Sequence, residues 1–545
     1  MYSKDIIKSC AILVLVIAFG FRGACADYFS ETIGEITWRY RKDNTGLGGA
    51  FRSYSDTLAT SALAAFPAEY KNSAVSLTLP SMIGDMQVRN INYRAFYDTA
   101  AYMADKDPNY PWIKEIIIPE GIRYIATDAF EGCTGCERIV FPDSLWKVDD
   151  AALYFSTIKD MVFSQTVLDC NQIRFYKPTL ENATSSAGVT SIPDRAFREC
   201  SVLTNLTFST NLKSIGEQVV ARCENLKSIA IPNSVTNIAG AAFAGCNLTE
   251  IALPYVGICR GDKGGDRRGF WYIWGDKVST LSSPSYYRWK EGSTSRLSPL
   301  SIKSVVLTDE TDLGNATFID CTTITNITLP LGLKNIGTGS FSNCNSLASI
   351  IIPNSVTNIG TRAFDRCTSM KSVKIGTGVK SLGDNIFANC GMVSSVQIPE
   401  CVCNRSMASM FPSSYSNISR AIIIDGAREI AVSAFAGCTG LSSIVIPYGV
   451  TNICSNAFAS CRSLESVIIP DSVESLGNGA FSNCLGLKKI SLPVALSGNT
   501  DGVFSGCPDD LEVIYRMTDN ENYLYWEDVT DGPNPPMSKN YNVSM

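Results

Sequence analysis

The chain has 545 residues, with 46 Lys and Arg, 52 Asp and Glu, 20 Cys and no His, and its formal charge is −6. The absence of His excludes Ser-His-Asp and Cys-His catalysis and His-ligated zinc, and the acidic charge disfavours a nucleic-acid partner. A content of 45% hydrophobic and 18% charged residues is typical of a folded chain.

Residues 1–26 are predicted to be a secretory signal peptide. Two lysines precede an apolar run over residues 10–21, and Ala24-Cys25-Ala26 ends the segment with small residues. A basic start, a short apolar stretch and a small-residue cleavage site are typical of such a peptide. The apolar run is too short to span a membrane, which needs about 20 residues. We therefore expect a secreted or cell-surface protein without stable membrane insertion.

A repeat with a period of 23 residues begins near residue 77 and ends near residue 515. Eight of the eleven intervals between twelve cysteines equal 23 residues; these cysteines lie at positions 133, 200, 223, 246, 321, 344, 367, 390, 438, 461, 484 and 507. A fixed period of 20 to 50 residues is the signature of a solenoid, in which each repeat is one coil that cannot fold alone.

The unit from Cys344 to Cys367 shows the pattern most clearly. Ile350 and Ile352 are two residues apart, so both point to one face of a short strand, and the proline that follows ends the strand. The return segment has the form Val-x-x-Ile-Gly-x-x-Ala-Phe, in which Gly supplies backbone freedom. The predicted fold is a mainly β repeat solenoid of ~23-residue coils, each with one short parallel β-strand and an irregular or short-helical return.

These motifs resemble the BspA-type leucine-rich repeats of bacterial and protozoan cell-surface proteins. The Ile-Pro after the strand, the Ile-Gly-x-x-Ala-Phe return and the Cys that opens the next unit carry the resemblance, which covers about four fifths of the chain. It implies a leucine-rich repeat solenoid and a surface or secreted protein that binds host matrix proteins or other cells. It also implies that residues 27–76, which contain Glu35-Ile36-Thr37-Trp38-Arg39-Tyr40, form an N-terminal cap module.

The cysteine ladder allows two interpretations. Secretion favours disulfides, and stacked coils would bring successive cysteines within the permitted Cα range. Parallel, in-register side chains point the same way, however, which favours buried free thiols that act as small apolar residues. Cys133-x-x-Cys136 contains a repeat cysteine, and Cys401-x-Cys403 has no second pair nearby to complete a metal site. We expect no metal and no cofactor.

The repeat frame predicts which strand residues face outward and are candidates for contact with a partner. They are Ala230, Ala252, Val306, Thr328, Ile351, Lys374, Gln397, Ile423, Val445, Ile468 and Ser491. Seven of these eleven residues are aliphatic, and a contiguous apolar row on an exposed sheet commonly marks an interaction surface. The alternative is that β-branched residues simply suit strands and are shielded by their neighbours.

A second candidate region is the segment 255–300, where the repeat register breaks. It is rich in aromatic residues, including Trp271, Trp274 and Trp289, and it carries eight basic residues against four acids. Aromatic residues with Arg are enriched at binding hot spots, and aromatic faces also stack on sugars. The alternative interpretation is a self-packed loop whose aromatic residues form a local core.

The leading hypothesis for function is a non-enzymatic, secreted or surface-displayed protein that binds an extracellular or host protein or a glycan. The second is an architectural component that associates with itself in an envelope or extracellular layer. A third, a carbohydrate-active enzyme, would use the four acids of the insertion: Asp262, Asp266, Asp276 and Glu291. The predicted segments are the signal peptide 1–26, the cap 27–76, the solenoid 77–254, the insertion 255–300, the solenoid 301–515 and a polar tail 516–545.

Overall fold

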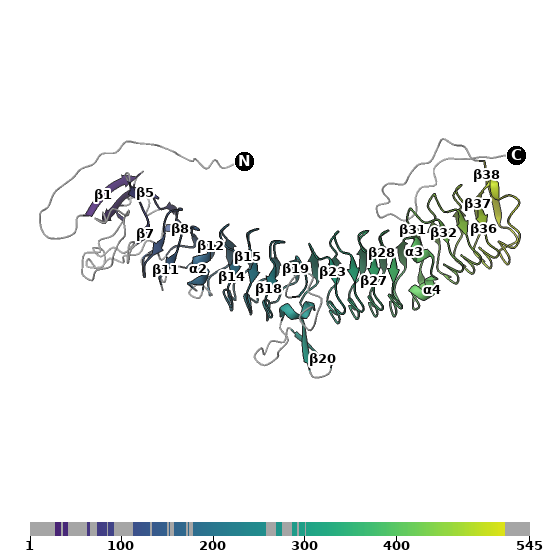
Figure 1. The fold of residues 1–545 in the computed structure, drawn as a ribbon, viewed down its shortest axis with the longest axis horizontal. Coiled ribbons are helices and arrows are strands. Elements are labelled where there is room, and N and C mark those ends of the chain that lie inside the picture. Colours follow the sequence, from purple (N-terminus) through teal and green to yellow (C-terminus); the bar gives the residue numbers. More distant parts are fainter. Residues whose placement is uncertain are drawn as a thin grey trace. The chain divides into compact units, whose positions relative to one another are not determined.

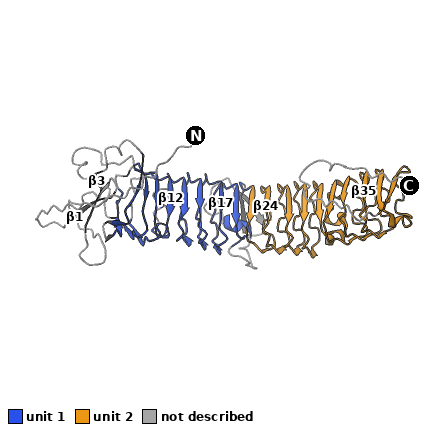
Figure 2. Cartoon of the chain, turned by 90° about the horizontal axis from the view of Figure 1, so that it is seen from above, with its two compact units in different colours: residues 1–302 blue, residues 303–545 orange. Residues whose placement is uncertain are grey.

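The computed structural model forms two compact units, residues 1–302 and 303–545 (Figure 2). The described residues are 28–33, 36–41, 63–65, 74–83, 86–91, 113–130, 133, 135–149, 152, 157–170, 173, 178–257, 269–274, 286–291, 294–299 and 301–517. The predicted signal peptide and most of the tail lie outside the described residues. Among the described residues, no helix is long and apolar enough to cross a membrane.

The first unit contains a parallel sheet built from one short strand per coil (Figure 1). Its order is β15-β13-β12-β10-β8-β4, and β17 and β19 continue the series as a separate parallel pair. The strands are β4 (Val75–Thr78), β8 (Ile113–Ile117), β10 (Arg138–Val140), β12 (Asp160–Phe163), β13 (Asn182–Ser185), β15 (Asn205–Thr207), β17 (Ser228–Ala230) and β19 (Glu250–Leu253).

On the return side of the same coils, two-residue strands form two further parallel sheets. The first contains β7 (Asn90–Ile91), β9 (Tyr124–Ile125) and β11 (Lys147–Val148); the second contains β14 (Ser191–Ile192), β16 (Ser214–Ile215) and β18 (Asn237–Ile238). The helix α2 (Gln165–Asp169) lies in the chain between these two sheets.

The remaining elements of the first unit interrupt the repeat. At the N-terminal end lie the antiparallel strands β1 (Tyr28–Ile33), β2 (Ile36–Arg41) and β3 (Leu63–Ala65) and the hairpin β5 (Met82–Ile83) with β6 (Met86–Gln87). The predicted insertion contains the 3₁₀ helix η3 (Phe270–Trp274) and the hairpin β20 (Tyr286–Glu291) with β21 (Thr294–Pro299).

The second unit repeats the same arrangement. Its strand side contains β22 (Ser304–Leu307), β24 (Asn326–Thr328), β26 (Ser349–Ile352), β28 (Ser372–Ile375), β30 (Ser395–Ile398), β31 (Arg420–Ile423), β33 (Ser443–Val445), β35 (Ser466–Ile468), β37 (Lys489–Pro493) and β38 (Glu512–Arg516). Its return side contains β23 (Asp312–Leu313), β25 (Asn335–Ile336), β27 (Asn358–Ile359), β29 (Ser381–Leu382), β32 (Glu429–Ile430), β34 (Asn452–Ile453) and β36 (Ser475–Leu476). Short helical turns are α3 (Glu400–Cys403), α4 (Met407–Met410), η4 (Tyr415–Asn417) and η5 (Val494–Leu496). The predicted parallel solenoid is confirmed.

Inward-facing aliphatic residues and a stack of phenylalanines form the core of each coil. Ile350 and Ile352 are 1% and 2% exposed, as the alternation predicted, and Ile359 on the return side is fully buried. Phe341 and Phe364 stack with ring centroids 5.0 Å apart and planes 5° from parallel. Because the coils are in register, each ring finds the same partner one coil away, so no coil can bury its own core alone.

The repeat cysteines form a ladder of thiols within this core. The described cysteines are free, and eight of the repeat thiols donate to a main-chain carbonyl 26 residues earlier, as Cys367 does to Phe341 at 3.2 Å. Burial raises the pKa of Cys246 and of Cys438 to about 12. The interpretation as buried free thiols agrees with this arrangement.

The glycine of the Ile-Gly pair has a different role from the one expected. Gly360 was predicted to supply backbone freedom, but its φ lies outside the left-handed region. A Cβ atom at this position would lie 2.5 Å from the main-chain nitrogen of Thr338 in the preceding coil. The glycine is therefore needed for close approach between coils. The left-handed conformation instead falls on non-glycine residues such as Arg362, with φ 53°.

Candidate functional site

The strand side of the second unit presents a row of outward-facing side chains. Register pairs Ile351 with Lys374, Lys374 with Gln397, and Ile468 with Ser491 across neighbouring parallel strands. The outward row comprises Val306, Thr328, Ile351, Lys374, Gln397, Ile422, Val445, Ile468, Ser491 and Ile514. Alternation of side chains along each strand turns these residues away from the core.

Large aliphatic side chains of this row are exposed. Ile351, Val445 and Ile468 are 62%, 47% and 69% exposed. Lys374 is also exposed, whereas Val306 and Gln397 are half-buried. Eight of the nine residues predicted from sequence on this side of the second unit lie in the outward row, because Thr328 and Ser491 join these six.

Ile423 is a correction to the predicted row. It is 1% exposed and lies beside the inward-facing Ile398, while its neighbour Ile422 pairs with Gln397 and Val445 and occupies the outward position. Strand β31 ends in Ile422 and Ile423, a third isoleucine follows it, and no Ile-Pro pair marks the end of this strand. The sequence therefore does not reveal which isoleucine faces outward, and the pairing of β31 with both neighbours decides it.

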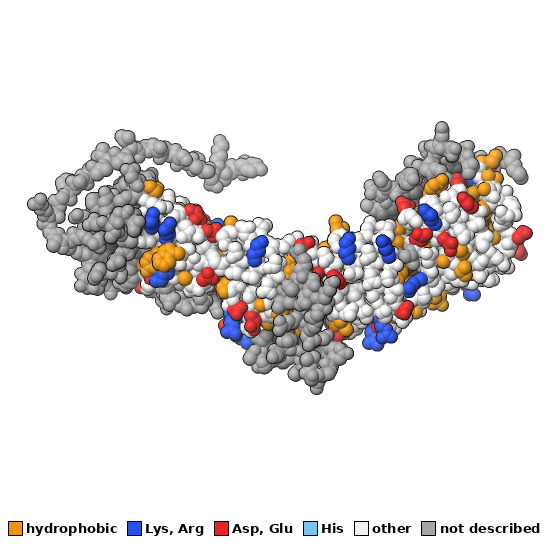
Figure 3. Space-filling view, in the orientation of Figure 1, with side chains coloured by type: hydrophobic (Ala, Val, Ile, Leu, Met, Phe, Trp, Pro, Cys, Tyr) orange, Lys and Arg blue, Asp and Glu red, His pale blue; other side chains and the backbone are white. Residues whose placement is uncertain are grey.

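Four residues form what we call the apolar patch: Ile422, Val445 and Ile468, on the consecutive strands β31, β33 and β35, and Tyr448, in the turn after β33. Val445 pairs with Ile422 on the adjacent strand, and Tyr448, which follows β33, is 60% exposed. Figure 3 shows hydrophobic side chains among Lys, Arg, Asp and Glu near the coils of β31 to β38. Clustered exposed apolar residues with a charged rim are typical of a protein interface.

A row of small residues lies beside the outward row. Ser349, Ser372 and Ser395 are paired on successive strands, Arg420 takes the next position, and Ser443 follows it. Short serine side chains do not cover the aliphatic residues next to them, so the outward row stays accessible to a partner.

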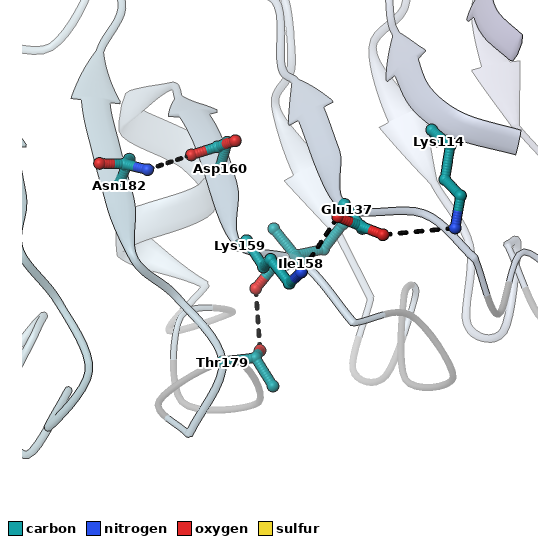
Figure 4. Close-up of polar contacts among 7 residues, drawn as sticks. All are labelled: Lys114, Glu137, Ile158, Lys159, Asp160, Thr179 and Asn182. Carbon is teal, nitrogen blue, oxygen red and sulfur yellow. Dashed lines mark hydrogen bonds and ion pairs between the residues drawn. The ribbon is translucent and has the colours of Figure 1, made fainter. Parts of the chain in front are cut away.

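The strand side of the first unit has a different chemical character. Glu137 accepts hydrogen bonds from Lys114 at 3.3 Å and from Lys159 at 3.1 Å, so three neighbouring coils carry alternating charges (Figure 4). The hydrogen bond from Lys159 and, to a smaller extent, that from Lys114 hold the pKa of Glu137 below its usual value. In the adjacent row, Arg138 donates to Glu115 at 2.6 Å. Because these charges are already paired within the chain, a partner would gain little free energy of binding by forming ion pairs with them.

Trp271 and Trp274 of the insertion are not the exposed contacts that one of the two sequence interpretations predicted. Trp271 and Trp274 are 8% and 0% exposed, and the Trp274 ring lies 5.9 Å from the ring of Phe243. Main-chain bonds from Ala241 to Tyr272 at 2.9 Å and from Phe243 to Ile273 at 3.0 Å join η3 to the preceding coil. The segment thus takes the place of a return segment, and its tryptophans complete the core. This geometry supports the local-core interpretation.

The other candidate residues of the insertion remain untested by the structure. Trp289 lies in β20, together with Glu291, and Asp262, Asp266 and Asp276 lie outside the described residues. Within the described ranges, no group of three or more Cys, Asp and Glu side chains is arranged to hold a metal ion.

The sequence interpretation overlooked one irregular coil of the second unit. Phe411, at the end of α4, stacks on Phe387 at 4.8 Å, and Ser414 is fully buried three residues later, where other coils have cysteine. Both residues lie 24 positions from their counterparts on either side, so a search that allowed 24 as well as 23 would have found them.

Comparison with known proteins identifies the class. The model of the BspA type leucine rich repeat region matches residues 109–223, 190–258, 297–414 and 407–523. Together these segments cover well over half of the chain, so the chain belongs to the family of BspA-type leucine-rich repeat proteins.

Solved structures similar to this chain include leucine-rich repeat proteins from bacteria. One from Bacteroides ovatus is 22% identical over 89% of this chain and 99% of its own, with a TM-score of 0.30. A leucine rich cell surface protein from Faecalibacterium prausnitzii is 18% identical over 90% of this chain and 96% of its own, with a TM-score of 0.23. The pneumococcal vaccine antigen PcpA is 17% identical over 90% of this chain and 97% of its own, with a TM-score of 0.23. Among curated proteins, none matches this sequence.

Proposed function

We propose that this chain is a non-enzymatic, secreted or surface-displayed protein that binds an extracellular or host protein through the strand side of its second unit. The observation that carries the proposal is the apolar patch, in which the exposed Val445 and Ile468 and the half-buried Ile422 lie on consecutive strands and the exposed Tyr448 lies in the turn after β33. Isolated exposed apolar residues are normal on a soluble protein, but a contiguous group with a polar rim marks an interaction site.

Chemical variety around the patch supports recognition of a protein. Arg420 of β31 lies in the neighbouring row, and Lys489 and Glu512 continue that row as an ion pair with 3.4 Å between the charged atoms. Tyr and Arg are enriched at the centres of protein interfaces, where an aromatic or aliphatic anchor supplies most of the free energy of binding. Secretion is supported by the signal-peptide pattern of residues 1–26.

Binding to immobilised extracellular matrix proteins tests the proposal, with the double variant Val445→Asp/Ile468→Asp compared with the unaltered protein. Burial of two carboxylates at an interface would cost several kcal/mol, so we expect at least a tenfold loss of affinity. Leu485→Asp is the matched control, because Leu485 is 57% exposed but lies in a turn rather than on the strand side. Equal binding by the double variant and the control would contradict the assigned surface.

Self-association is the second candidate function, and one observation favours it. Within the described ranges, β38 is paired on one side only, with β37, and its inward-facing Val513 and Tyr515 are half-buried rather than buried. An unpaired strand edge is a template for another chain. Light scattering of the purified protein distinguishes the two functions. A concentration-dependent oligomer that the variant Val513→Lys no longer forms supports self-association, whereas a monomer supports the binding function.

A further inference from the structure

Trp146 stands out on the return side of the first unit, because it is 68% exposed. It occupies the position directly before a return strand, here β11. At this position the other coils have Arg89, Arg123, Thr190, Lys213, Thr236, Thr311, Lys334, Thr357, Lys380, Arg428, Thr451 and Glu474. All of those residues are polar or charged. The repeat therefore does not require an aromatic residue here, and the exposed indole has no role in the core.

A second aromatic ring lies beside the indole, and an ion pair lies beside that second ring. The ring centroid of Tyr124 lies 6.5 Å from that of Trp146, with the two planes 40° apart. The Tyr124 hydroxyl donates a hydrogen bond to Asp149, and Lys147 Nζ lies 2.8 Å from Asp149 Oδ1 and 5.2 Å from the centroid of the Tyr124 ring. Figure 3 shows a hydrophobic cluster beside Lys and Arg side chains over the region of β9 and β11.

The backbone beneath this group is held firmly. The main-chain nitrogen of Trp146 donates to the carbonyl of Arg123 at 2.9 Å, and the Thr166 hydroxyl donates to the carbonyl of Leu145 at 2.6 Å. Leu145 is 5% exposed and anchors the segment in the core. A binding group on a rigid element loses little conformational entropy when a ligand docks.

We propose that Trp146, Tyr124, Lys147 and Asp149 form a binding site for a pyranose sugar of a glycan. One face of a pyranose ring carries C–H groups and can lie on an indole, as apolar surface on an aromatic face. The hydroxyls around the ring need donors and acceptors, which Lys147 and Asp149 supply beside the neighbouring Tyr124 ring. Both charged side chains are partly exposed, 50% and 21%, so they can reach a ligand while they remain paired.

The small size of the site favours a sugar over a protein. A stable protein interface buries about 1,200 to 2,000 Å² in total, which far exceeds two aromatic side chains and one ion pair. One face of a single sugar ring is similar in area to one face of an indole. This site lies on the return side of the first unit and does not depend on the protein-binding surface proposed above.

Saturation-transfer NMR on the full chain tests the proposal, with methyl β-D-galactopyranoside, methyl α-D-mannopyranoside and triacetylchitotriose as probes. We expect transfer to the ring C–H protons of at least one probe. We expect Trp146→Ala to reduce that transfer about fivefold or more and Trp146→Phe to reduce it less, since a smaller ring retains part of the face. Leu331→Ala is the matched control, because it removes an 87% exposed apolar side chain from a turn of the second unit that lies outside both proposed binding surfaces, and we expect no change.

The variant Asp149→Asn tests the hydrogen bonds to the sugar hydroxyls separately from the stacking of the sugar on Trp146. It removes the carboxylate that holds Lys147 and Tyr124, so we expect weaker transfer with an unchanged circular dichroism spectrum. Absence of transfer from all three probes overturns the proposal, and so does equal transfer in Trp146→Ala and the unaltered protein. Binding of a protein that is lost in Trp146→Ala, without transfer from any sugar probe, would assign the site to a protein instead.

Discussion

The thiol of Cys390 donates a hydrogen bond to the carbonyl oxygen of Phe364, with 3.1 Å between sulfur and oxygen. Both residues are fully buried. The carbonyl group lies in the core, where an unpaired polar group costs about 1 to 3 kcal/mol. Cysteine therefore has two roles in each coil: it fills a small apolar space and it supplies a donor to the neighbouring coil.

Ser414→Cys should stabilise the second unit. Ser414 is fully buried in the position of a repeat cysteine, and its hydroxyl has no hydrogen-bond partner among the residues that the structure describes. A thiol is less costly to bury than an unpaired hydroxyl, so we expect the free energy of unfolding to rise by about 1 kcal/mol. Urea denaturation measures the change, and Cys390→Ser, which introduces the hydroxyl into a regular coil, should destabilise. A lower midpoint for Ser414→Cys would refute this account.

The stability of the protein should fall steeply in alkaline solution. Burial raises the pKa of Cys246 and Cys438 from 9.0 to about 12. A group whose pKa is higher in the folded state binds its proton more tightly there, so its contribution is complete below pH 9 and is lost as the pH rises toward 12. Thermal unfolding from pH 7 to 11 measures this loss. The same burial predicts slow alkylation of Cys246 and Cys438 by iodoacetamide at pH 8 without denaturant, and rapid alkylation of these two thiols in the native protein would contradict it.

Glu137→Lys should destabilise the first unit in a salt-dependent way. The variant would place a cation between Lys114 and Lys159, which now lie 3.3 and 3.1 Å from the glutamate oxygens. Exposed ion pairs contribute little individually, so we expect a loss of about 1 kcal/mol in 20 mM salt and a smaller loss in 1 M salt. Denaturation at the two salt concentrations measures both values. An equal loss in both would show that packing, not charge, is responsible.

Gly360→Ala should destabilise the second unit strongly, although alanine is a small residue. The added Cβ would lie 2.5 Å from the nitrogen of Thr338, which is main-chain and cannot move aside alone. Overpacking of this kind costs about 1 to 3 kcal/mol. Gly332→Ala is the control, because no atom lies within 4 Å of its added Cβ. Similar stability of the two variants in urea would refute the close-approach role of Gly360.

Much of the solenoid could be predicted because each regular coil repeats the same sequence pattern of apolar residues. Alternation correctly assigned Ile350 and Ile352 to the core and Ile351 to the surface. The pattern did not explain Gly360, because close contact with Thr338 arises only when the coils stack. It did not identify Ser414 either, because the spacing around that coil is 24 rather than 23 residues.

The sequence by itself determined the period, the inward-facing residues and the family, because repetition makes each local choice visible many times. Only the tertiary structure decided which residues became neighbours between coils. It turned Ile423 inward and Ile422 outward, buried Trp271 and Trp274 against the core, and left Trp146 exposed beside Tyr124. The physical reason is that exposure in a solenoid depends on the register between coils, and where the repeat becomes irregular that register is set by stacking rather than by local sequence.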